Sequence, residues 1–436
     1  GPELDERFAW EVFLIRDRTL NAFALPGGYF GVHLGLMGAV GSPDELAAVL
    51  AHELSHVTQR HISRLMTQQS KQAPWMIAAM ILGALAASKH PDAGTAAIVG
   101  GQALAAQGQL NFSRDMEREA DRVGFGVMND AGYASRGVAD MFAKLQQASR
   151  LNDNGAFPYL RSHPLSTERI AQAQARVQLA SAASPSPRQQ ADDSRAQLLH
   201  AMMAARARVL AASGVDALRP MQVEARRRLG APGGFSSSDP AAASRDAGLL
   251  YGGALAAARL RDFSDARSLL KPLRQLTADT ARADKLAGLL AMEIDLLEGK
   301  TPPSAALADI AKAATRAELL TQARALMAAN RAQEVAPALR AWVADHPRDA
   351  LAWQLLAQAH GQQNQPVPAI RADAESRVAQ LEYVGALDRL KAAQALMRSQ
   401  PGSADHVEAS IIDTRARQVE SMVKEQALQD KIDQKM

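Results

Sequence analysis

The sequence predicts a mainly α-helical protein with one small β-hairpin or sheet. Only 4% of its 436 residues are aromatic, which disfavours β-sandwiches and barrels because strands favour aromatic and β-branched side chains. Alanine, the residue with the highest helix propensity, is abundant throughout. The chain is also longer than the roughly 100 to 200 residues of one domain. We therefore expect a compact domain followed by stacked helix pairs.

Three regions are expected along the chain. Residues 1–180 hold the strand and helix signals of one compact domain. Residues 181–195 are rich in proline, serine and alanine without periodicity, which is typical of a linker. Residues 196–436 alternate helical segments with short breaks, as in a helical solenoid.

The first elements are predicted from turn and cap signals. Residues 21–25 and 29–34 are expected to form a hairpin, because Pro26-Gly27-Gly28 between them supplies a turn. Ser42 and the proline after it are typical of a helix start. This helix is expected to run to about Gln68.

Further helices are expected downstream, beginning near Ser113, at Ser135 and after a cap at Ser166. In the C-terminal region, the turn around Asp262, the His346-Pro347 pair and Tyr383 match positions of tetratricopeptide repeats. These matches are degenerate, so a generic solenoid or helix bundle is the alternative.

A metal-binding pattern lies inside the first predicted helix. His52 and His56 are four residues apart, so both imidazoles lie on one face, with Glu53 beside them. Two imidazole ligands and a carboxylate that deprotonates a bound water are the requirements of a hydrolytic zinc site. His61 is expected to face away from the metal. Six further histidines are expected to have no role there: His33, His90, His200, His346, His360 and His406.

Two acidic residues on the next helix complete this prediction. Glu117 and Asp121 are also four residues apart and share one face, while Glu119 points the opposite way. Glu117 is expected to be the third protein ligand, and Asp121 to orient a histidine from behind. A solvated acidic face paired with arginines is the alternative interpretation.

These motifs resemble the HtpX and CAAX-prenyl protease group of gluzincins, which join HExxH to a downstream ExxxD helix. The resemblance also rests on the Asn21-Ala22-Phe23 strand and on the run from His163 through Arg169. It implies a zincin-like metallopeptidase that uses one Zn²⁺ ion and cleaves polypeptides. Together with C-terminal repeats, it points to a bacterial periplasmic branch of the group.

The resemblance and the chemistry together suggest roles for single residues. Glu53 is expected to activate the water on the metal and to pass its proton to the leaving amine. His163 is expected to reach the zinc in the resting protein, as inhibitor, catalytic aid or both, and Arg169 to stabilise the oxyanion. The edge strand that contains Asn21, Ala22 and Phe23 is expected to hold substrate, with an ordinary core hairpin as the alternative.

We expect the enzyme to hydrolyse misfolded or stalled outer-membrane proteins, while the repeats recruit substrate or assembly machinery. A chaperone-like interaction module with a structural or latent zinc site is the alternative. The chain contains 49 basic and 46 acidic residues, mixed along its length. This distribution does not indicate a basic surface for nucleic-acid binding. The chain has no cysteine, which excludes thiolate ligands.

Membrane contact and targeting are the remaining expectations. The uncharged stretch Ala73 to Ala87 is 15 residues long, shorter than the roughly 18 to 20 needed to span a bilayer. Together with residues 94–110, it is expected to form an apolar lid over the cleft or to contact a membrane peripherally, with a buried core helix as the alternative. The chain opens on Gly1-Pro2, which resembles the remnant of a cleaved tag, so we expect a signal peptide to be missing.

Overall fold

A computed structural model describes most of the chain, and it is mainly helical with one small sheet, as predicted. The described residues are 8–65, 67, 113–150, 158–180, 187–231, 235, 239–307, 309–399 and 406–433. The chain divides into two compact units, Gly1–Asp284 and Lys285–Met436. Helix α9 (Pro187–Ala211) begins inside the segment expected to be a linker, because proline is favoured in the first turn of a helix.

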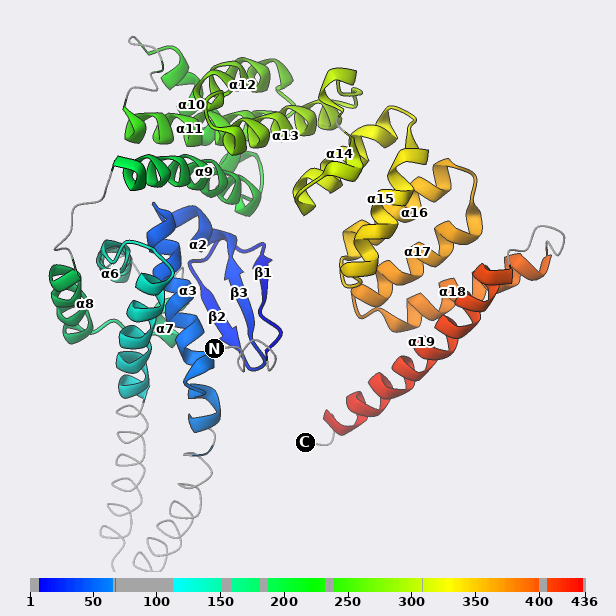
Figure 1. Cartoon of the computed structure of the whole chain (residues 1–436), viewed down its shortest axis with the longest axis horizontal. Coiled ribbons are helices and arrows are strands. Elements are labelled where there is room, and N and C mark those ends of the chain that lie inside the picture. Colours follow the sequence, from blue (N-terminus) through cyan, green and yellow to red (C-terminus); the bar gives the residue numbers. More distant parts are fainter. Residues whose placement is uncertain are drawn as a thin grey trace, which may run out of the picture. The chain divides into compact units, whose positions relative to one another are not determined.

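The first unit contains the sheet and the helices around it (Figure 1). In addition to α9 and a helix at 113–130, its elements are β1 (Glu11–Ile15), β2 (Ala22–Leu25), β3 (Tyr29–His33), α2 (Leu34–Ala39), α3 (Pro43–Thr58), α6 (Arg136–Arg150), α7 (Tyr159–Ser162), α8 (Thr167–Ala180), α10 (Val215–Leu229), α11 (Pro240–Arg259) and α12 (Phe263–Thr277). Helix α13 (Ala281–Glu298) contains the boundary between the units.

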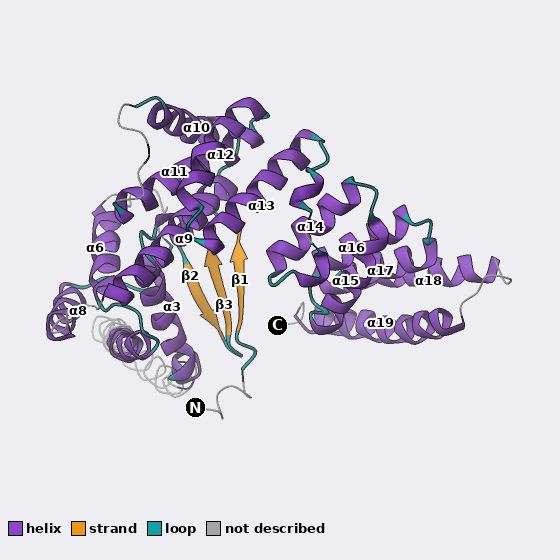
Figure 2. Ribbon diagram, turned by 45° about the horizontal axis from the view of Figure 1, so that its top comes forward, coloured by secondary structure: helices purple, strands orange, loops and turns teal. Residues whose placement is uncertain are grey.

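The sheet has three strands in the order β1-β3-β2 (Figure 2). Strands β2 and β3 form the predicted antiparallel hairpin, with Gly27 and Gly28 at φ values of +93° and +84° in the turn. Strand β1 was not predicted from the sequence and pairs in parallel with β3. The expected second strand also ends one residue early, at His33, where α2 begins.

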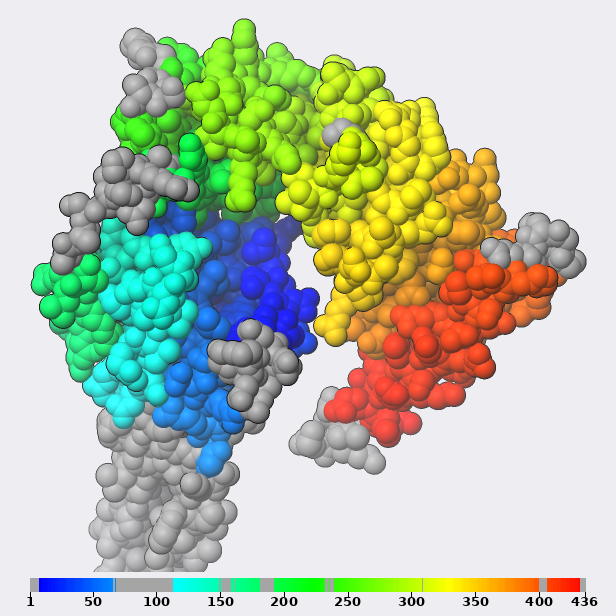
Figure 3. Space-filling view, viewed as in Figure 1, coloured from blue at the N-terminus to red at the C-terminus, as the bar shows by residue number. Residues whose placement is uncertain are grey.

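Strand β1 lies at an edge of the sheet, and its large side chains are exposed. Val12, Phe13 and Leu14 are 57%, 37% and 60% exposed, and the dark blue N-terminal strands reach the surface in Figure 3. Strand β2 forms the other edge and packs against α3.

Helix α3 begins as the sequence predicts and ends earlier. Ser42 Oγ accepts a hydrogen bond from the backbone N–H of Glu45 at 3.1 Å, which satisfies one of the free donors in the first turn. The helix ends at Thr58 instead of near Gln68. Arg60 adopts a left-handed φ of +54°, and the chain returns to helix at 61–65.

Helix α9 packs against α2 and supports the segment that leads into α3 (Figure 1). Three α9 side chains, Gln197, His200 and Arg208, bond to carbonyl oxygens of that segment at 2.6, 2.9 and 2.8 Å. These bonds satisfy carbonyls at the end of α2 that have no partner within the helix. The first helices of the predicted solenoid therefore belong to the same unit as the HExxH pattern.

The second unit consists of successive helix pairs. After two short 3₁₀ turns its helices are α14 (Arg316–Ala328), α15 (Ala332–Asp345), α16 (Ala350–Gln362), α17 (Pro366–Ala379), α18 (Tyr383–Ser399) and α19 (His406–Asp433). Asn330 and Asn364 have left-handed φ values of +58° and +55° in equivalent inter-helix turns. Their separation equals the roughly 34-residue period of tetratricopeptide repeats. The fold prediction for this region is confirmed.

Candidate metal centre

Helix α3 carries three side chains of the site. His52 and His56 lie one turn apart, and their Nε2 atoms are 3.0 Å from each other. Residues four apart in an α-helix differ in direction by only about 40°, so both rings lie on one side of α3. Glu53 lies beside them and is 2% exposed.

The helix at 113–130 supplies two carboxylates. Glu117 Oε2 is 3.4 Å from His52 Nε2, and Glu117 Oε1 is 3.3 Å from His56 Nε2. Asp121 Oδ1 lies 3.0 Å from the other ring nitrogen of His52, Nδ1. The structure thus places Glu117 among the donor atoms and Asp121 behind a histidine, the arrangement expected from the sequence.

The two helices approach each other closely at Gly124. A Cβ atom added there would lie 3.0 Å from the backbone carbonyl of Ala51 and 3.1 Å from the backbone nitrogen of His52. These contacts are tighter than most Cβ contacts in proteins, so a side chain at this position would push the two backbones apart by a few tenths of an ångström. Since one of the two contacted residues is itself a candidate ligand, Gly124 sets how near Glu117 lies to the histidines.

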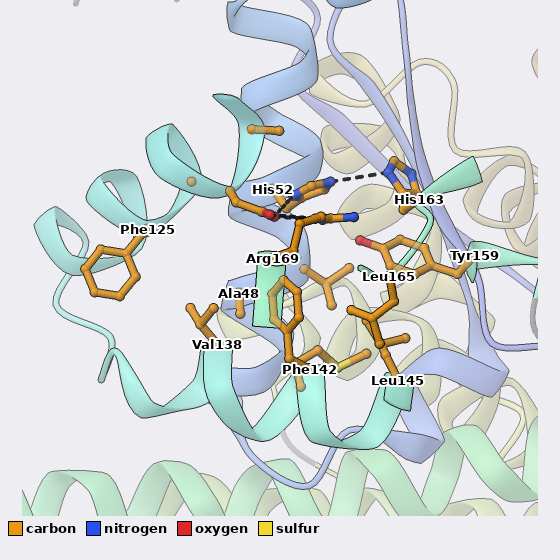
Figure 4. A pocket seen from close by; sticks show the side chains of 15 residues that line it. Ala48, His52, Phe125, Val138, Phe142, Leu145, Tyr159, His163, Leu165 and Arg169 are labelled. Atoms are coloured by element: carbon orange, nitrogen blue, oxygen red, sulfur yellow. Dashed lines mark hydrogen bonds and ion pairs between the residues drawn. The ribbon is translucent and has the colours of Figure 1, made fainter. Parts of the chain in front are cut away.

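His163 enters from a distant part of the chain, just after α7. Its Nδ1 lies 3.3 Å from His52 Nε2 and 3.0 Å from Glu117 Oε1. The ring packs on Tyr159, with 4.6 Å between ring centroids. Figure 4 shows His163 and His52 directed toward each other. His163 therefore joins the cluster, as expected, although 111 residues separate it from His52.

The donor atoms lie close enough together to share one zinc ion. One donor atom from each of His52, His56, Glu117 and His163 lies within 4.8 Å of the others. The five separations given above lie between 3.0 and 3.4 Å. Ligand atoms about 2.0 to 2.1 Å from a tetrahedral zinc ion are roughly 3.3 to 3.4 Å from one another. Imidazole nitrogen and carboxylate oxygen are also ligands that zinc accepts.

The charges of the cluster favour a cation. Burial disfavours protonation of His52, but hydrogen bonds with Asp121 and Glu117 outweigh this effect and raise the pKa of His52 to about 10. Burial raises the pKa of Glu117, yet hydrogen bonds with His163, His52 and His56 hold this pKa far below its usual range. The carboxylates favour a positive charge on His52, and the imidazoles favour a negative charge on Glu117, so a positive charge is stabilised beside Glu117. A divalent metal ion supplies such a charge.

Glu53 has a carboxylate oxygen without a hydrogen bond. Its Oε1 atom is fully buried and accepts no hydrogen bond from any described residue. His163 Nε2 lies 3.3 Å away, outside hydrogen-bond geometry. A buried carboxylate oxygen without a partner is costly unless water or another ligand bonds to it. This atom is therefore suited to accept a proton from a water at the metal.

Arg169 lies in the site, and its guanidinium group is hydrogen-bonded to neighbouring side chains and backbone. Its Nε and Nη2 atoms donate to the two carboxylate oxygens of Asp121 at 2.6 and 2.8 Å. Its Nη1 donates to the carbonyl of Pro164 at 2.7 Å and lies 2.9 Å from Glu117 Oε2. These bonds orient both carboxylates. Direct contact between Arg169 and an oxyanion stays a prediction.

His61 corrects one expectation from the sequence. It is 2% exposed, and its Nδ1 lies 2.9 Å from Nδ1 of His56. The prediction that it faces away assumed a continuous helix, whereas the left-handed Arg60 turns the chain between the two rings. Burial and the neighbouring His56 lower the pKa of His61. The other described histidines with bonded side chains, His33, His200, His346 and His360, lie elsewhere.

A small pocket of about 40 Å³ lies beside His52 and His163 (Figure 4). Val138 and Phe142 of α6 form part of its wall. Apolar neighbours lower the local dielectric constant, which strengthens hydrogen bonds such as the one between His52 and Asp121. The sequence did not predict this pocket, because its walls come from separate segments.

The predicted substrate strand lies next to the HExxH helix. Strand β2 contains Ala22 and Phe23, is an edge of the sheet and packs on α3. Asn21 precedes it, and its carbonyl accepts a hydrogen bond from the backbone N–H of His33 at 3.0 Å. Phe23 packs over Gly31 of the neighbouring strand. Substrate binding at this edge stays a prediction.

Both segments expected to cover the cleft or contact a membrane, Ala73 to Ala87 and residues 94–110, lie outside the described residues. Within the described ranges, no helix combines the length and apolar character that crossing a membrane requires.

Comparison with known proteins decides the family. The pattern of peptidase family M48 matches residues 3–177. The β-barrel assembly-enhancing protease of Escherichia coli strain K12 is 31% identical over 367 residues, which cover 83% of this chain and 70% of that protein. The chain belongs to peptidase family M48. It is therefore a zinc metallopeptidase, in agreement with the donor cluster.

Two further M48 relatives extend the comparison. The β-barrel assembly-enhancing protease of Yersinia pestis is 28% identical over 399 residues, or 90% of this chain and 76% of that protein. A Vibrio cholerae protein with a similar description is 40% identical over 173 residues. That match covers 40% of this chain and 36% of the relative. The matches with the Escherichia coli and Yersinia pestis proteins are longer than the peptidase region, so they extend into the helix pairs.

Proposed function

We propose that this M48 peptidase is a zinc-dependent endopeptidase in which His52, His56 and Glu117 hold one Zn²⁺ ion. The observation that carries the proposal is the buried donor cluster, in which one ligand atom from each of His52, His56, Glu117 and His163 lies within 4.8 Å of the others. The hydrogen-bond acceptor at Glu53 beside them supports it, since a purely structural metal site needs no general base.

We assign each residue of the site a separate role in peptide hydrolysis. A zinc ion, when bound, lowers the pKa of water and polarises a carbonyl group. Glu53 takes a proton from the attacking water and delivers it to the nitrogen of the leaving amine. Asp121 holds the ring of His52 through Nδ1 at 3.0 Å, and Arg169 holds Asp121 and Glu117.

His163 is proposed to keep the resting enzyme at low activity. Its Nδ1 supplies the fourth donor of the cluster, the position that catalytic zinc sites leave open for water or substrate. Catalysis then requires His163 to move aside, after which its imidazole is available to donate a hydrogen bond to the oxyanion. His163→Ala is expected to reduce the number of nitrogen ligands by one in zinc-edge spectroscopy and to raise basal cleavage. Unchanged coordination together with unchanged activity would remove His163 from the site.

Substrate is proposed to add as a strand to the open edge of β2. The backbone of an edge strand offers hydrogen bonds to an extended polypeptide and is independent of its side chains. Such recognition suits unfolded chains. Because β2 packs on α3, a strand bound there would run beside the candidate metal centre.

The relatives suggest the biological setting. Their names state an assembly-enhancing role for β-barrel proteins, so we propose misfolded or stalled outer-membrane proteins as substrates, in the bacterial periplasm. The helix pairs would recruit these substrates or the assembly machinery. Peripheral membrane contact through Ala73 to Ala87 stays a prediction.

One comparison tests the enzymatic proposal. Wild type and Glu53→Gln are measured for zinc content and for cleavage of an unfolded outer-membrane protein. We expect equal zinc content and a cleavage rate that falls by about 10² to 10⁴ in the variant, the range of general-base contributions. Equal cleavage by both proteins would contradict the proposal.

A chaperone-like module with a latent metal site is the second candidate. Four protein donors around one point are typical of structural zinc sites, and this observation favours it. Absence of cleavage by wild type and by His163→Ala, with zinc bound in both, would support this alternative.

A further inference from the structure

The two candidate histidine ligands on α3 are supported in different ways. His52 has a carboxylate directly behind it, because Asp121 Oδ1 lies 3.0 Å from its Nδ1. Behind His56 stands another histidine, since His61 Nδ1 lies 2.9 Å from His56 Nδ1. The proposed function assigns no role to His61, although its ring is 2% exposed.

The contacts continue beyond His61 to a carboxylate. His61 Nε2 is 3.2 Å from Glu119 Oε2, and that oxygen accepts a hydrogen bond from Arg64 Nη1 at 2.7 Å. Glu119 comes from the helix that also carries Glu117, but on its opposite side. The structure therefore contains an ordered line of side chains, His56, His61, Glu119 and Arg64, that starts at the donor cluster.

Hydrogen-bond chemistry gives this line one direction. An ionised carboxylate only accepts hydrogen bonds, so Glu119 requires a proton on Nε2 of His61. The Nδ1 atoms of His61 and His56 lie 2.9 Å apart, so only one of them carries a proton. With its proton on Nε2, His61 accepts at Nδ1 from Nδ1 of His56. His56 in turn carries its lone pair on Nε2, the atom that lies 3.0 Å from His52 Nε2 and 3.3 Å from Glu117 Oε1. The opposite tautomer of His56 would direct an N–H at the metal.

We infer that His61 and Glu119 are positioning residues that fix the tautomer and ring orientation of His56 for metal binding. This inference rests on the proposed metal site. The carboxylate of Glu119 acts through one imidazole on a second one, whereas Asp121 acts on His52 directly. Both ligand histidines thereby obtain the carboxylate support that metal-binding histidines require.

Zinc affinity of the full chain, measured by competition with a chromophoric chelator, tests the inference. Loss of an outer partner of a ligating histidine typically weakens metal binding about 10- to 100-fold. We expect such a loss for His61→Phe, which keeps a buried ring, and for Glu119→Ala at a partly exposed position. Glu168→Gln is the matched control. It removes an arginine-paired carboxylate, 2.9 Å from Arg118, for which no bond to a histidine is found among the described residues.

A conservative variant separates positioning from packing. In His61→Gln the amide oxygen accepts from His56 and the amide nitrogen donates to Glu119, so zinc should bind more tightly than to His61→Phe. The melting temperature of each metal-free variant is measured alongside. Zinc affinity of His61→Phe and Glu119→Ala equal to that of wild type would overturn the inference. The inference would also be overturned if His61→Gln and His61→Phe lost zinc affinity equally and in proportion to the fall in their metal-free melting temperatures. A wild-type chain that binds no zinc would instead overturn the proposed function.

Discussion

The donor cluster of the first unit and the helix core of the second unit bury different kinds of side chain. In the first unit the donor cluster buries Glu117 and His163 at 4% and 8% exposure, together with Glu53 and Arg169. In the described part of the second unit the fully buried large side chains are apolar, as at Leu326, and many ion pairs lie at the surface. The first arrangement depends on a few precise contacts, because a buried polar group that loses its partner is costly. The second distributes its stability over many apolar contacts.

The sharpest test of this contrast is a change in the helix contact at Gly124. Gly124→Val places a side chain 3.0 Å or less from the backbone of Ala51, which should separate Glu117 from the histidines. A misplacement of about 1 Å costs roughly 100-fold in catalysis, so we expect at least that loss of cleavage together with weaker zinc binding. Gly126→Val is the control, since a Cβ there meets nothing within 4 Å. Equal effects of both substitutions would show that the close contact is not what matters.

A core truncation in the second unit should act on stability alone. Leu339→Ala removes a fully buried side chain from the cluster shared by α14, α15 and α16, and such truncations cost about 2 to 5 kcal/mol. Urea unfolding should show this loss in the free energy of unfolding, while zinc content stays at the wild-type level. Val384→Ala, at a position that is 60% exposed, serves as the control. Loss of zinc from Leu339→Ala would contradict the independence of the two units.

The contacts of Asp349 in the second unit should make the stability of the fold depend on pH. Burial by itself raises the pKa of Asp349. Hydrogen bonds with Arg316, Trp342 and the backbone N–H of Ala352 lower this pKa by more than burial raises it, so the pKa lies below its usual value. The ionised form therefore stabilises the fold. This contribution to the free energy of unfolding is complete above the unfolded-state pKa of about 3.9. It decreases as the pH falls below that value and is lost as the pH passes the lower pKa of the folded state.

Asp349→Asn should lower the melting temperature at pH 7 and should have a smaller effect at pH 3. Thermal unfolding followed across this range is the measurement, with the exposed Asp345→Asn as control. An effect of Asp349→Asn that is as large at pH 3 as at pH 7 would rule out ionisation as its cause.

The smallest effect is expected at an exposed ion pair. Arg331 and Glu334 lie one turn apart at the start of α15, and each side chain is 41% exposed. Solvent screens such a pair, and both long side chains lose entropy when they pair. Glu334→Gln should therefore leave the melting temperature and zinc affinity unchanged within error. A clear loss of stability would mean that surface pairs carry more of the second unit than its apolar clusters suggest.

The sequence alone determined those features that depend on residues a few positions apart. The cap at Ser42 predicted the start of α3, and the serine at 166 predicted that of α8, because a side-chain oxygen bonds to an N–H three residues later. The four-residue spacing of His52 and His56, and of Glu117 and Asp121, predicted which side chains share a helix face. The hairpin and the helix pairs followed from turn residues and apolar periodicity.

Only the tertiary structure decided which distant residues meet. The parallel pairing of β1, the contact between His56 and His61, and the line that continues to Glu119 were not predicted. The position of His163 was expected from a resemblance and not from any local pattern. The physical reason is that local hydrogen bonds specify helices and turns, whereas the meeting of distant side chains depends on how elements pack. In this protein one backbone turn at Arg60 and one close helix approach at Gly124 set that packing.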